Sequence, residues 1–259
     1  MEITFLGVGS CMPVQEGDDT ASLLIDRHIM IDTGWDPVRN LLRAGVNPND
    51  VSHLFFTHMH QDHYIGLAQL LFYIMNIRHS FTALRIYGPE GLEEILQRAL
   101  LFAGFDRHHA GENREKVILE KPEWSELPEK GEIQAGDVTL QFIPSHHAVP
   151  GRCYRLSNGT GQSITYSGDT EPFPELIPFA RDSDILIHET AFGPLSSHGS
   201  NCYFHSGATD AAETALSAGV KRLFMVHMSP SQREEALIRA RAIFPATFCP
   251  VEGETICAR

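Results

Sequence analysis

The chain has 259 residues, of which 42% are hydrophobic and 20% are charged. This composition excludes a disordered or collagen-like protein and is typical of a globular chain with a sizeable core. Lys and Arg number 20 against 33 Asp and Glu, which gives a formal net charge of −13. Because proteins that bind long polyanions neutralise phosphates with Lys and Arg, this balance argues against an extended nucleic-acid partner.

The predicted elements alternate between strands and helices along the chain. In chain order we expect strands at 2–6, 22–26 and 29–32, a helix at 37–43, a strand at 53–57, a helix at 66–77, a strand at 84–87 and a helix at 89–103. Residues 104–131 are polar and are expected to form a loop. Strands follow at 138–143, 153–156, 163–167 and 184–187, then a helix at 207–217, a strand at 222–226 and a helix at 231–244. No Gly/Ser linker divides the chain, so we expect a single α/β domain over residues 1–259, built as a layered sandwich.

The ends and cysteines of the chain bear on its location. Residues 1–10 lack the basic segment and long apolar run of a secretory signal, and no apolar run reaches the length that crosses a bilayer. The five cysteines are scattered and form no CxxC pair, which is typical of reduced thiols. We therefore expect a cytoplasmic protein with no membrane segment.

Four residues of metal-ligand type stand together in residues 57–63 (THMHQDH), directly after a buried strand. In an extended segment, residues two apart point the same way, so His58 and His60 can bind one ion together. If a helix begins next, Asp62 and His63 face a neighbouring space and can hold a second ion. The alternative is a histidine-rich polar loop or a helix cap, but four such residues among six positions argue against chance.

This segment resembles the HxHxDH hallmark of the metallo-β-lactamase superfamily, whose members form a four-layer αββα sandwich with a two-metal site at one edge of the sheets. A later His, a bridging Asp and a final His complete that site, and candidates follow three predicted strands in the same order. The resemblance implies two Zn²⁺ ions, with Mn²⁺ or Fe also suited. It assigns the first metal to His58, His60 and His147, the second to Asp62, His63 and His227, and the bridge to Asp169.

Two of these assignments have alternatives. Of the adjacent pair His146 and His147, the spacing to Tyr154-Arg155 in the superfamily's ribonuclease Z branch favours His147, with His146 as the alternative. Asp169 follows a glycine and could instead be a turn residue. An anionic bridge at this position is physically reasonable, because two dications a few ångström apart repel each other strongly.

Two further segments bear on the branch of the superfamily. Lactonases, thioesterases, sulfatases, β-lactamases and phosphodiesterases share the ligand set, so the ligands alone do not name a substrate. Residues 188–192 (HETAF) and 205–206 (HS) resemble the HEAT and HST elements of ribonuclease Z and its phosphodiesterase relatives. The resemblance implies a pair of Glu189 and His205 that assists the departing oxygen, beside Asp62 as proton acceptor. The alternative is that Glu189 and His205 only cap neighbouring elements.

The apparatus that grips tRNA in ribonuclease Z has no counterpart in this sequence. The interval from His147 to Asp169 is too short for the long basic, glycine-rich arm, and the earlier arm position, near residues 76–84, is also short. The family's PxKxRN signature aligns with residues 13–18 (PVQEGD), where Gln and acids replace the basic residues. These differences predict that the chain keeps the phosphodiester chemistry without binding tRNA.

We therefore expect a metal-dependent phosphodiesterase that acts on a small phosphodiester, most simply a cyclic mononucleotide opened to the nucleoside monophosphate. Anti-Pycsar enzymes and phosphoribosyl cyclic phosphodiesterases are relatives of this kind. The alternatives are a tRNA 3′-endonuclease, a lactonase or sulfatase, and a metal-binding sensor without catalysis.

Such relatives are commonly homodimers, so a homodimer is expected here too. In some of them a loop of one subunit closes the pocket of the other, and residues 102–109 could provide such a lid, with Phe105 stacked on a base and Arg107 or His108 on the phosphate. The alternative for this segment is a helix end followed by a mobile loop.

Overall fold

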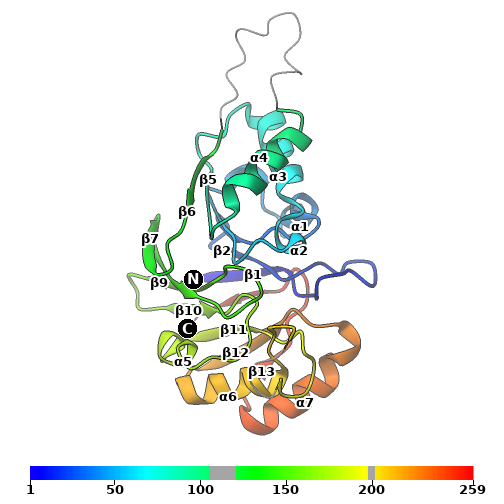
Figure 1. The fold of residues 1–259 in the computed structure, drawn as a ribbon, viewed down its shortest axis with the longest axis vertical. Coiled ribbons are helices and arrows are strands. Elements are labelled where there is room, and N and C mark those ends of the chain that lie inside the picture. Colours follow the sequence, from blue (N-terminus) through cyan, green and yellow to red (C-terminus); the bar gives the residue numbers. More distant parts are fainter. Residues whose placement is uncertain (106–120, 198–201, 259) are drawn as a thin grey trace, which may run out of the picture.

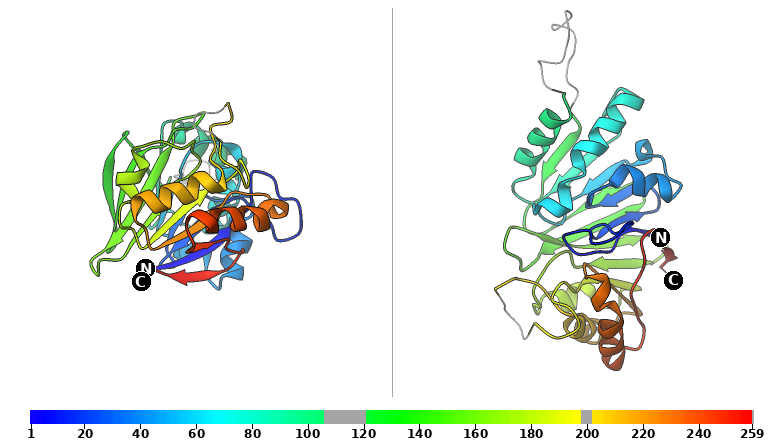
Figure 2. Two further views of the ribbon diagram at one scale, coloured as in Figure 1. Left: turned by 90° about the horizontal axis from the view of Figure 1, so that it is seen from below. Right: turned by 90° about the vertical axis from the view of Figure 1, so that its right-hand side faces the viewer.

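The computed structural model describes residues 1–105, 121–197 and 202–258. Two seven-stranded sheets pack face to face, and helices cover the outer side of each, so the αββα sandwich expected from the sequence is confirmed (Figure 1). The two ends of the chain lie side by side at one side of the sheets (Figure 2). Among the helices of the described residues, none has both the length and the apolar character needed to span a bilayer.

The first sheet has the strand order β14-β1-β2-β3-β4-β5-β6. Neighbours from β14 to β3 run antiparallel, and those from β3 to β6 run parallel. In chain order its strands are β1 (Glu2–Gly7), β2 (Ser22–Ile25), β3 (Ile29–Ile31), β4 (His53–Phe55), β5 (Arg85–Gly88), β6 (Glu123–Glu126) and β14 (Thr255–Cys257).

The second sheet repeats this plan with the strand order β13-β12-β11-β10-β9-β8-β7. Neighbours from β13 to β10 run parallel, and those from β10 to β7 run antiparallel. In chain order its strands are β7 (Gly131–Ala135), β8 (Val138–Pro144), β9 (Arg152–Asn158), β10 (Ser163–Tyr166), β11 (Ile185–Glu189), β12 (Arg222–Val226) and β13 (Thr247–Phe248).

The helices divide between the two outer layers (Figure 1). The layer on the first sheet contains α1 (Pro37–Arg43), the 3-10 turn η1 (Pro48–Asp50), α2 (Gln61–Tyr64), α3 (Leu67–Arg78) and α4 (Leu92–Phe102). The layer on the second sheet contains α5 (Leu176–Ala180), α6 (Ala208–Ala218), the 3-10 turn η2 (Pro230–Gln232) and α7 (Arg233–Ile243).

Local sequence signals explain several boundaries. Asp36 caps α1, because its side chain accepts a hydrogen bond from the Arg39 N–H and Pro37 follows at the first helical position. The helix expected from Pro89 begins only at Leu92, since Gly91 precedes it in the left-handed region at φ +99°. The expectation of a loop over residues 104–131 was wrong in part. Residues 123–126 form β6, an edge strand with mostly exposed side chains, so its sequence carries no apolar alternation.

Apolar side chains fill the space between the sheets and the space beneath each helical layer. Between the sheets, Phe5 and Phe55 of the first sheet join Tyr154 and Ile187 of the second in one fully buried cluster. Parallel strands buried on both faces appear as short apolar runs, which is how β4 and β11 were predicted. Burial of this surface supplies most of the stability that fixes the two sheets against each other.

The strand register brings several strand ends to one edge of the sandwich. In the second sheet, Tyr166 pairs with Ile187 and Glu189 with Val226, so β10, β11 and β12 end close together. A bridge between His58 and Gly151 and a hydrogen bond from the Arg152 N–H to the Thr57 carbonyl join this edge to the end of β4 in the first sheet. The loops that follow these strands therefore meet at a single place.

We predict that Tyr154→Phe lowers the free energy of unfolding by about 1–2 kcal/mol, because the Tyr154 hydroxyl donates a hydrogen bond to the buried Phe56 carbonyl of the other sheet. Tyr166 is its cross-strand neighbour and an equally buried control, and its hydroxyl has no hydrogen-bond partner among the described residues. Tyr166→Phe should be neutral or stabilising. Equal losses in urea unfolding for both variants would contradict this assignment.

Candidate metal centre

Seven side chains of metal-ligand type meet at the edge where the two sheets join. His58 follows β4, His147 follows β8, Asp169 follows β10 and His227 follows β12. The other three, which belong to the segment 57–63, are His60, directly before α2, and Asp62 and His63, within α2. The structure thus brings together all seven ligands that the resemblance implied.

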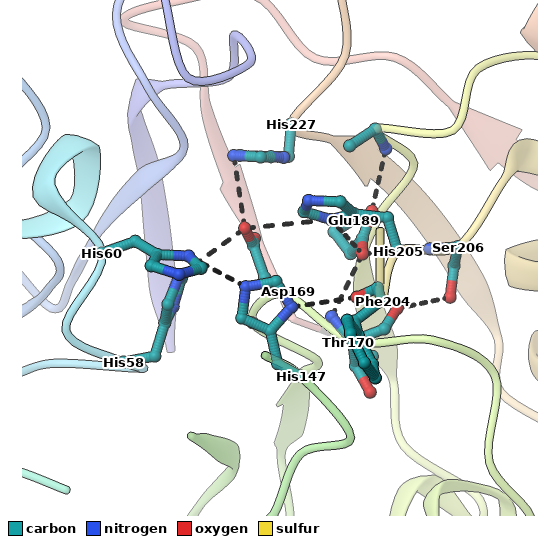
Figure 3. A network of polar contacts seen from close by, with 12 residues as sticks. His58, His60, His147, Asp169, Thr170, Glu189, Phe204, His205, Ser206 and His227 are labelled. Carbon is teal, nitrogen blue, oxygen red and sulfur yellow. Dashed lines mark hydrogen bonds and ion pairs between the residues drawn. The ribbon is translucent and has the colours of Figure 1, made fainter. Parts of the chain in front are cut away.

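Several groups of three ligand atoms here lie within 4.8 Å of one another, including His147 with Asp169 and His205, and two of the groups match the expected sets. One group consists of His58, His60 and His147, and the other of Asp62, His63 and His227. In the first group, His60 Nδ1 and His147 Nε2 lie 3.0 Å apart (Figure 3). In the second, Asp62 Oδ2 lies 3.4 Å from His63 Nε2 and 3.5 Å from His227 Nε2. These are the two sets expected for two metals.

Asp169 lies between the two groups. Its Oδ2 is 3.7 Å from His58 Nε2, 3.5 Å from His63 Nε2 and 3.5 Å from His227 Nε2. Figure 3 shows this carboxylate at the centre of the polar network. Only 3% of the Asp169 residue surface is exposed. A buried carboxylate surrounded by histidines of both groups has the position that a bridging ligand requires.

Contacts behind the histidines fix which ring nitrogen faces the centre. Nδ1 of His63 is 2.9 Å from Asp32 Oδ2, Nδ1 of His58 is 3.0 Å from the Thr57 hydroxyl, and Nδ1 of His147 donates to the Phe204 carbonyl at 2.9 Å. In each of these three rings, Nε2 is therefore the nitrogen that faces the other ligands. A partner on the outer nitrogen is the usual way in which proteins orient metal-ligating histidines.

Asp32 is a contributor that the sequence reasoning missed. It is fully buried after β3 and accepts hydrogen bonds from the Thr57 N–H and hydroxyl as well as contacting His63. Its φ of +57° lies in the left-handed region, which a non-glycine residue adopts at a cost in free energy. An aspartate at the end of the strand predicted over 29–32 was the available signal, but its partner lies 31 residues further along the chain.

The electrostatics of the site favour bound cations. Burial lowers the pKa of His58 well below its usual value and also lowers the pKa of His60 and His147, so these rings are neutral and can donate lone pairs. Burial opposes the charge of Asp169, yet His227 and His63 hold the pKa of this carboxyl well below its usual range. The carboxylate is therefore ionised in a buried place.

The donor set fits two metal ions. Among the described residues, His58 Nε2, His63 Nε2 and Asp169 Oδ1 are buried without a hydrogen-bond partner. Buried polar atoms are normally paired, because an unpaired one costs free energy. Imidazole and carboxylate donors suit Zn²⁺, Fe and Mn²⁺. The unpaired atoms therefore lie where metal–ligand bonds would satisfy them.

Glu189 and His205 form a pair beside the centre. His205 Nδ1 is 2.9 Å from Glu189 Oε1 and 3.9 Å from Asp169 Oδ2 (Figure 3). Burial alone would lower the pKa of His205, but the hydrogen bond with Glu189 and its charge raise it to about 9. Glu189 also accepts from the N–H groups of Thr170, Ala191 and Ser206, so it orders the surrounding loops as well as the ring.

Three other sequence expectations concern residues near the site. The ring of His146 turns away and stacks on Phe173 at 4.4 Å, and among the described residues it belongs to no ligand group. The ring of Phe105 packs against Phe72 and Phe81 in the outer helical layer, and its expected role in a lid over a partner subunit's pocket stays a prediction. Arg107 and His108, expected on the phosphate, lie outside the described residues.

A pocket of about 370 Å³ opens directly above the ligands. The described residues that line it are Ser10, Cys11, His60, Asp62, Asp169, Ala191, Phe192, Tyr203, His205 and His227. This volume lies within the range of small-molecule sites. Sequence reasoning missed these roles of Cys11, Phe192 and Tyr203, although Phe192 ends the segment 188–192 that the sequence analysis singled out.

Comparisons with known proteins define the class. Ribonuclease Z of Geobacillus kaustophilus is 28% identical over 97% of each chain, and that of Methanothermobacter thermautotrophicus is 30% identical over 95% of this chain and 93% of its own. Among solved structures, the metallo-β-lactamase fold protein YhfI from Bacillus subtilis has a TM-score of 0.79 at 18% identity over 98% of both chains. Human tRNase Z, short form, has a TM-score of 0.75 at 19% identity over 100% of both. The protein is a hydrolase of the ribonuclease Z-like branch of the metallo-β-lactamase fold.

Within this branch, one family model matches most of the chain. The model described as Anti-Pycsar protein Apyc1 covers residues 1–233. The chain belongs to the Apyc1 family.

We predict that His147→Ala lowers the bound metal from two ions per chain toward one, because it removes a ligand from the group with His58 and His60. His146→Ala is the matched control, since it changes the adjacent histidine, whose ring stacks on Phe173 instead. Inductively coupled plasma mass spectrometry of both dialysed variants measures the content. Metal loss in His146→Ala with full occupancy in His147→Ala would overturn the assignment.

Proposed function

We propose that the protein is a dinuclear-metal phosphodiesterase that hydrolyses a small phosphodiester, most simply a cyclic mononucleotide to the nucleoside monophosphate. The observation that carries the proposal is the pocket above the two ligand groups. His205, which is paired with the buried Glu189, lines this pocket, and the described residues that line it include no Lys or Arg. A small substrate with one phosphate fits such a pocket better than a polyanion does.

The region that aligns with the basic signature of ribonuclease Z supports a small substrate. Gln15, Glu16 and Asp18 border a separate pocket together with Glu252 and only one basic side chain, Arg43. The alignment with the Geobacillus protein spans 299 positions although this chain has 259 residues, so that ribonuclease Z has segments without a counterpart here. Both observations agree with the absence of a tRNA-binding arm from the sequence.

In the proposed reaction, His58, His60 and His147 would hold one ion, Asp62, His63 and His227 the other, and Asp169 would contact both. Such ions polarise a water molecule and offset negative charge on the phosphate. Zinc is our choice of metal because most of the donors are imidazoles, and Mn²⁺ and Fe remain compatible with them.

The protein's own groups would handle the protons. Asp62, whose carboxylate faces His63 and His227, would accept a proton from the attacking water. As the new P–O bond forms, the bond from phosphorus to the ribose oxygen breaks, and that oxygen takes a proton from His205. Glu189 engages Nδ1 of His205, which leaves Nε2 as the donating atom. For a cyclic phosphate, these transfers open the ring and yield the monoester.

Two further expectations from the sequence stay predictions. The homodimer is supported by α3 and α4, whose outer faces expose Phe72, Ile77, Leu101 and Phe102. Phe102 also borders a groove with Tyr64, so a second copy of the chain could bury apolar surface there.

A reducing, cytoplasmic location is supported by the five cysteines, all of which are free thiols.

A tRNA 3′-endonuclease is the second candidate function, because ribonuclease Z relatives align with 95% or more of this chain. We predict that the metal-loaded protein opens at least one of the common 3′,5′-cyclic mononucleotides and leaves precursor tRNA intact, since residues 13–18, which align with the basic signature of ribonuclease Z, contain no Lys or Arg. Chromatography of products from one preparation measures both. Cleavage of precursor tRNA without turnover of any cyclic nucleotide would establish the second candidate instead.

We predict that His205→Ala lowers kcat on the accepted substrate by about 10²- to 10⁴-fold, because the departing oxygen loses its proton donor. The metal content should stay near two ions per chain, since His205 belongs to neither proposed set. Steady-state kinetics and elemental analysis of the same sample measure the two quantities. A variant that lost its metal would show that His205 is a ligand and not the proton donor.

A further inference from the structure

Two of the residues that line the metal pocket are aromatic and are not proposed metal ligands. Phe192 and Tyr203 both line the pocket, with 38% and 66% of their surface exposed. Ser10, Cys11 and Ala191 also line the pocket, and they are not proposed metal ligands either. The pocket lining therefore combines proposed metal ligands and His205 with aromatic and small side chains.

The backbone around Phe192 is tied to the same groups that position His205. The Ala191 N–H donates to Glu189 Oε2 at 2.8 Å, and Glu189 Oε1 holds the His205 ring. The Phe192 N–H donates to the carbonyl of Ser206, the residue after His205, at 3.0 Å. Phe192 thus keeps a fixed place relative to the proton donor.

The turn that follows secures this loop further. The Gly193 N–H donates to the Thr190 carbonyl at 2.9 Å, and the Gly193 carbonyl accepts from the Ala208 N–H at the start of α6, also at 2.9 Å. Gly193 has a φ of +87°, in the region that favours glycine, and a Cβ there would come within 2.7 Å of the Gln232 side chain. Because these contacts anchor the loop, the partly exposed Phe192 has a more fixed position than an exposed Phe on an unanchored loop.

We infer that Phe192 and Tyr203, which both line the pocket, form the platform on which the nucleobase of the substrate stacks. The inference rests on the proposed function and adds the group that the pocket recognises. The described lining offers no Lys or Arg that could hold a second phosphate, and it includes the two aromatic side chains Phe192 and Tyr203. Stacking tolerates every base, because each has a π-face. The platform therefore selects nucleotides over base-free phosphodiesters and discriminates weakly among bases.

The test compares ligands with and without a base in isothermal titrations of the metal-loaded protein. The probes are a nucleoside 5′-monophosphate and ribose 5-phosphate, which share the ribose and the phosphate. For the wild type we expect the nucleotide to bind about tenfold more tightly. Phe192→Ala should abolish most of this difference while leaving the affinity for ribose 5-phosphate unchanged. Phe192→Tyr should restore it, because the ring face is retained.

Phe248→Ala is the matched control, because Phe248 has the same exposed fraction of 38% and lies on β13, outside the pocket lining. It should leave both affinities unchanged. Equal weakening of both ligands by Phe192→Ala, or no effect on either, would overturn the inference. Retention of the base preference by Phe192→Ala would do the same.

The titration also separates this inference from the proposed function. If the wild type opens no cyclic nucleotide but binds the nucleotide through Phe192, the platform stands and the proposed reaction falls. If cyclic nucleotides are opened and the base adds no affinity, the reaction stands and the platform falls.

Discussion

The structure depends on one electrostatic constraint, the ionised carboxylate of Asp169 buried between histidines of both ligand groups. A buried charge costs free energy unless positive groups compensate it. Here the rings of His63 and His227 lie 3.5 Å from the carboxylate, and two bound cations would supply the compensating positive charge. The other features of the site place and orient the side chains that make this burial possible.

The residues that surround the Asp169 carboxylate are placed there by the ends of strands in both sheets. His58 arrives from the first sheet and Asp169 from the second, and a hydrogen bond from the Arg152 N–H to the Thr57 carbonyl fixes the two sheets at this edge. Asp32 then holds His63 from behind. A rigid support of this kind sets ligand positions before any ion binds, which favours tight and selective metal binding.

Much of this arrangement could be predicted from the sequence, because metal ligands leave local patterns. The segment 57–63 is recognisable from its high content of metal-ligand residues. His147, Asp169 and His227 each come after a segment whose sequence predicts a strand. The sequence did not reveal Asp32 or the wall with Phe192, whose roles arise from partners far along the chain. The edge strand β6 was missed because its exposed side chains show no apolar period.

The central claim is that two ions share Asp169 at the junction of the sheets. Anomalous diffraction from crystals of the zinc-reconstituted protein, collected on both sides of the zinc absorption edge, tests it most directly. The account predicts two anomalous peaks on opposite sides of the Asp169 carboxylate, one contacting His147 and the other His227. A single peak, or two peaks that do not both touch Asp169, would contradict it.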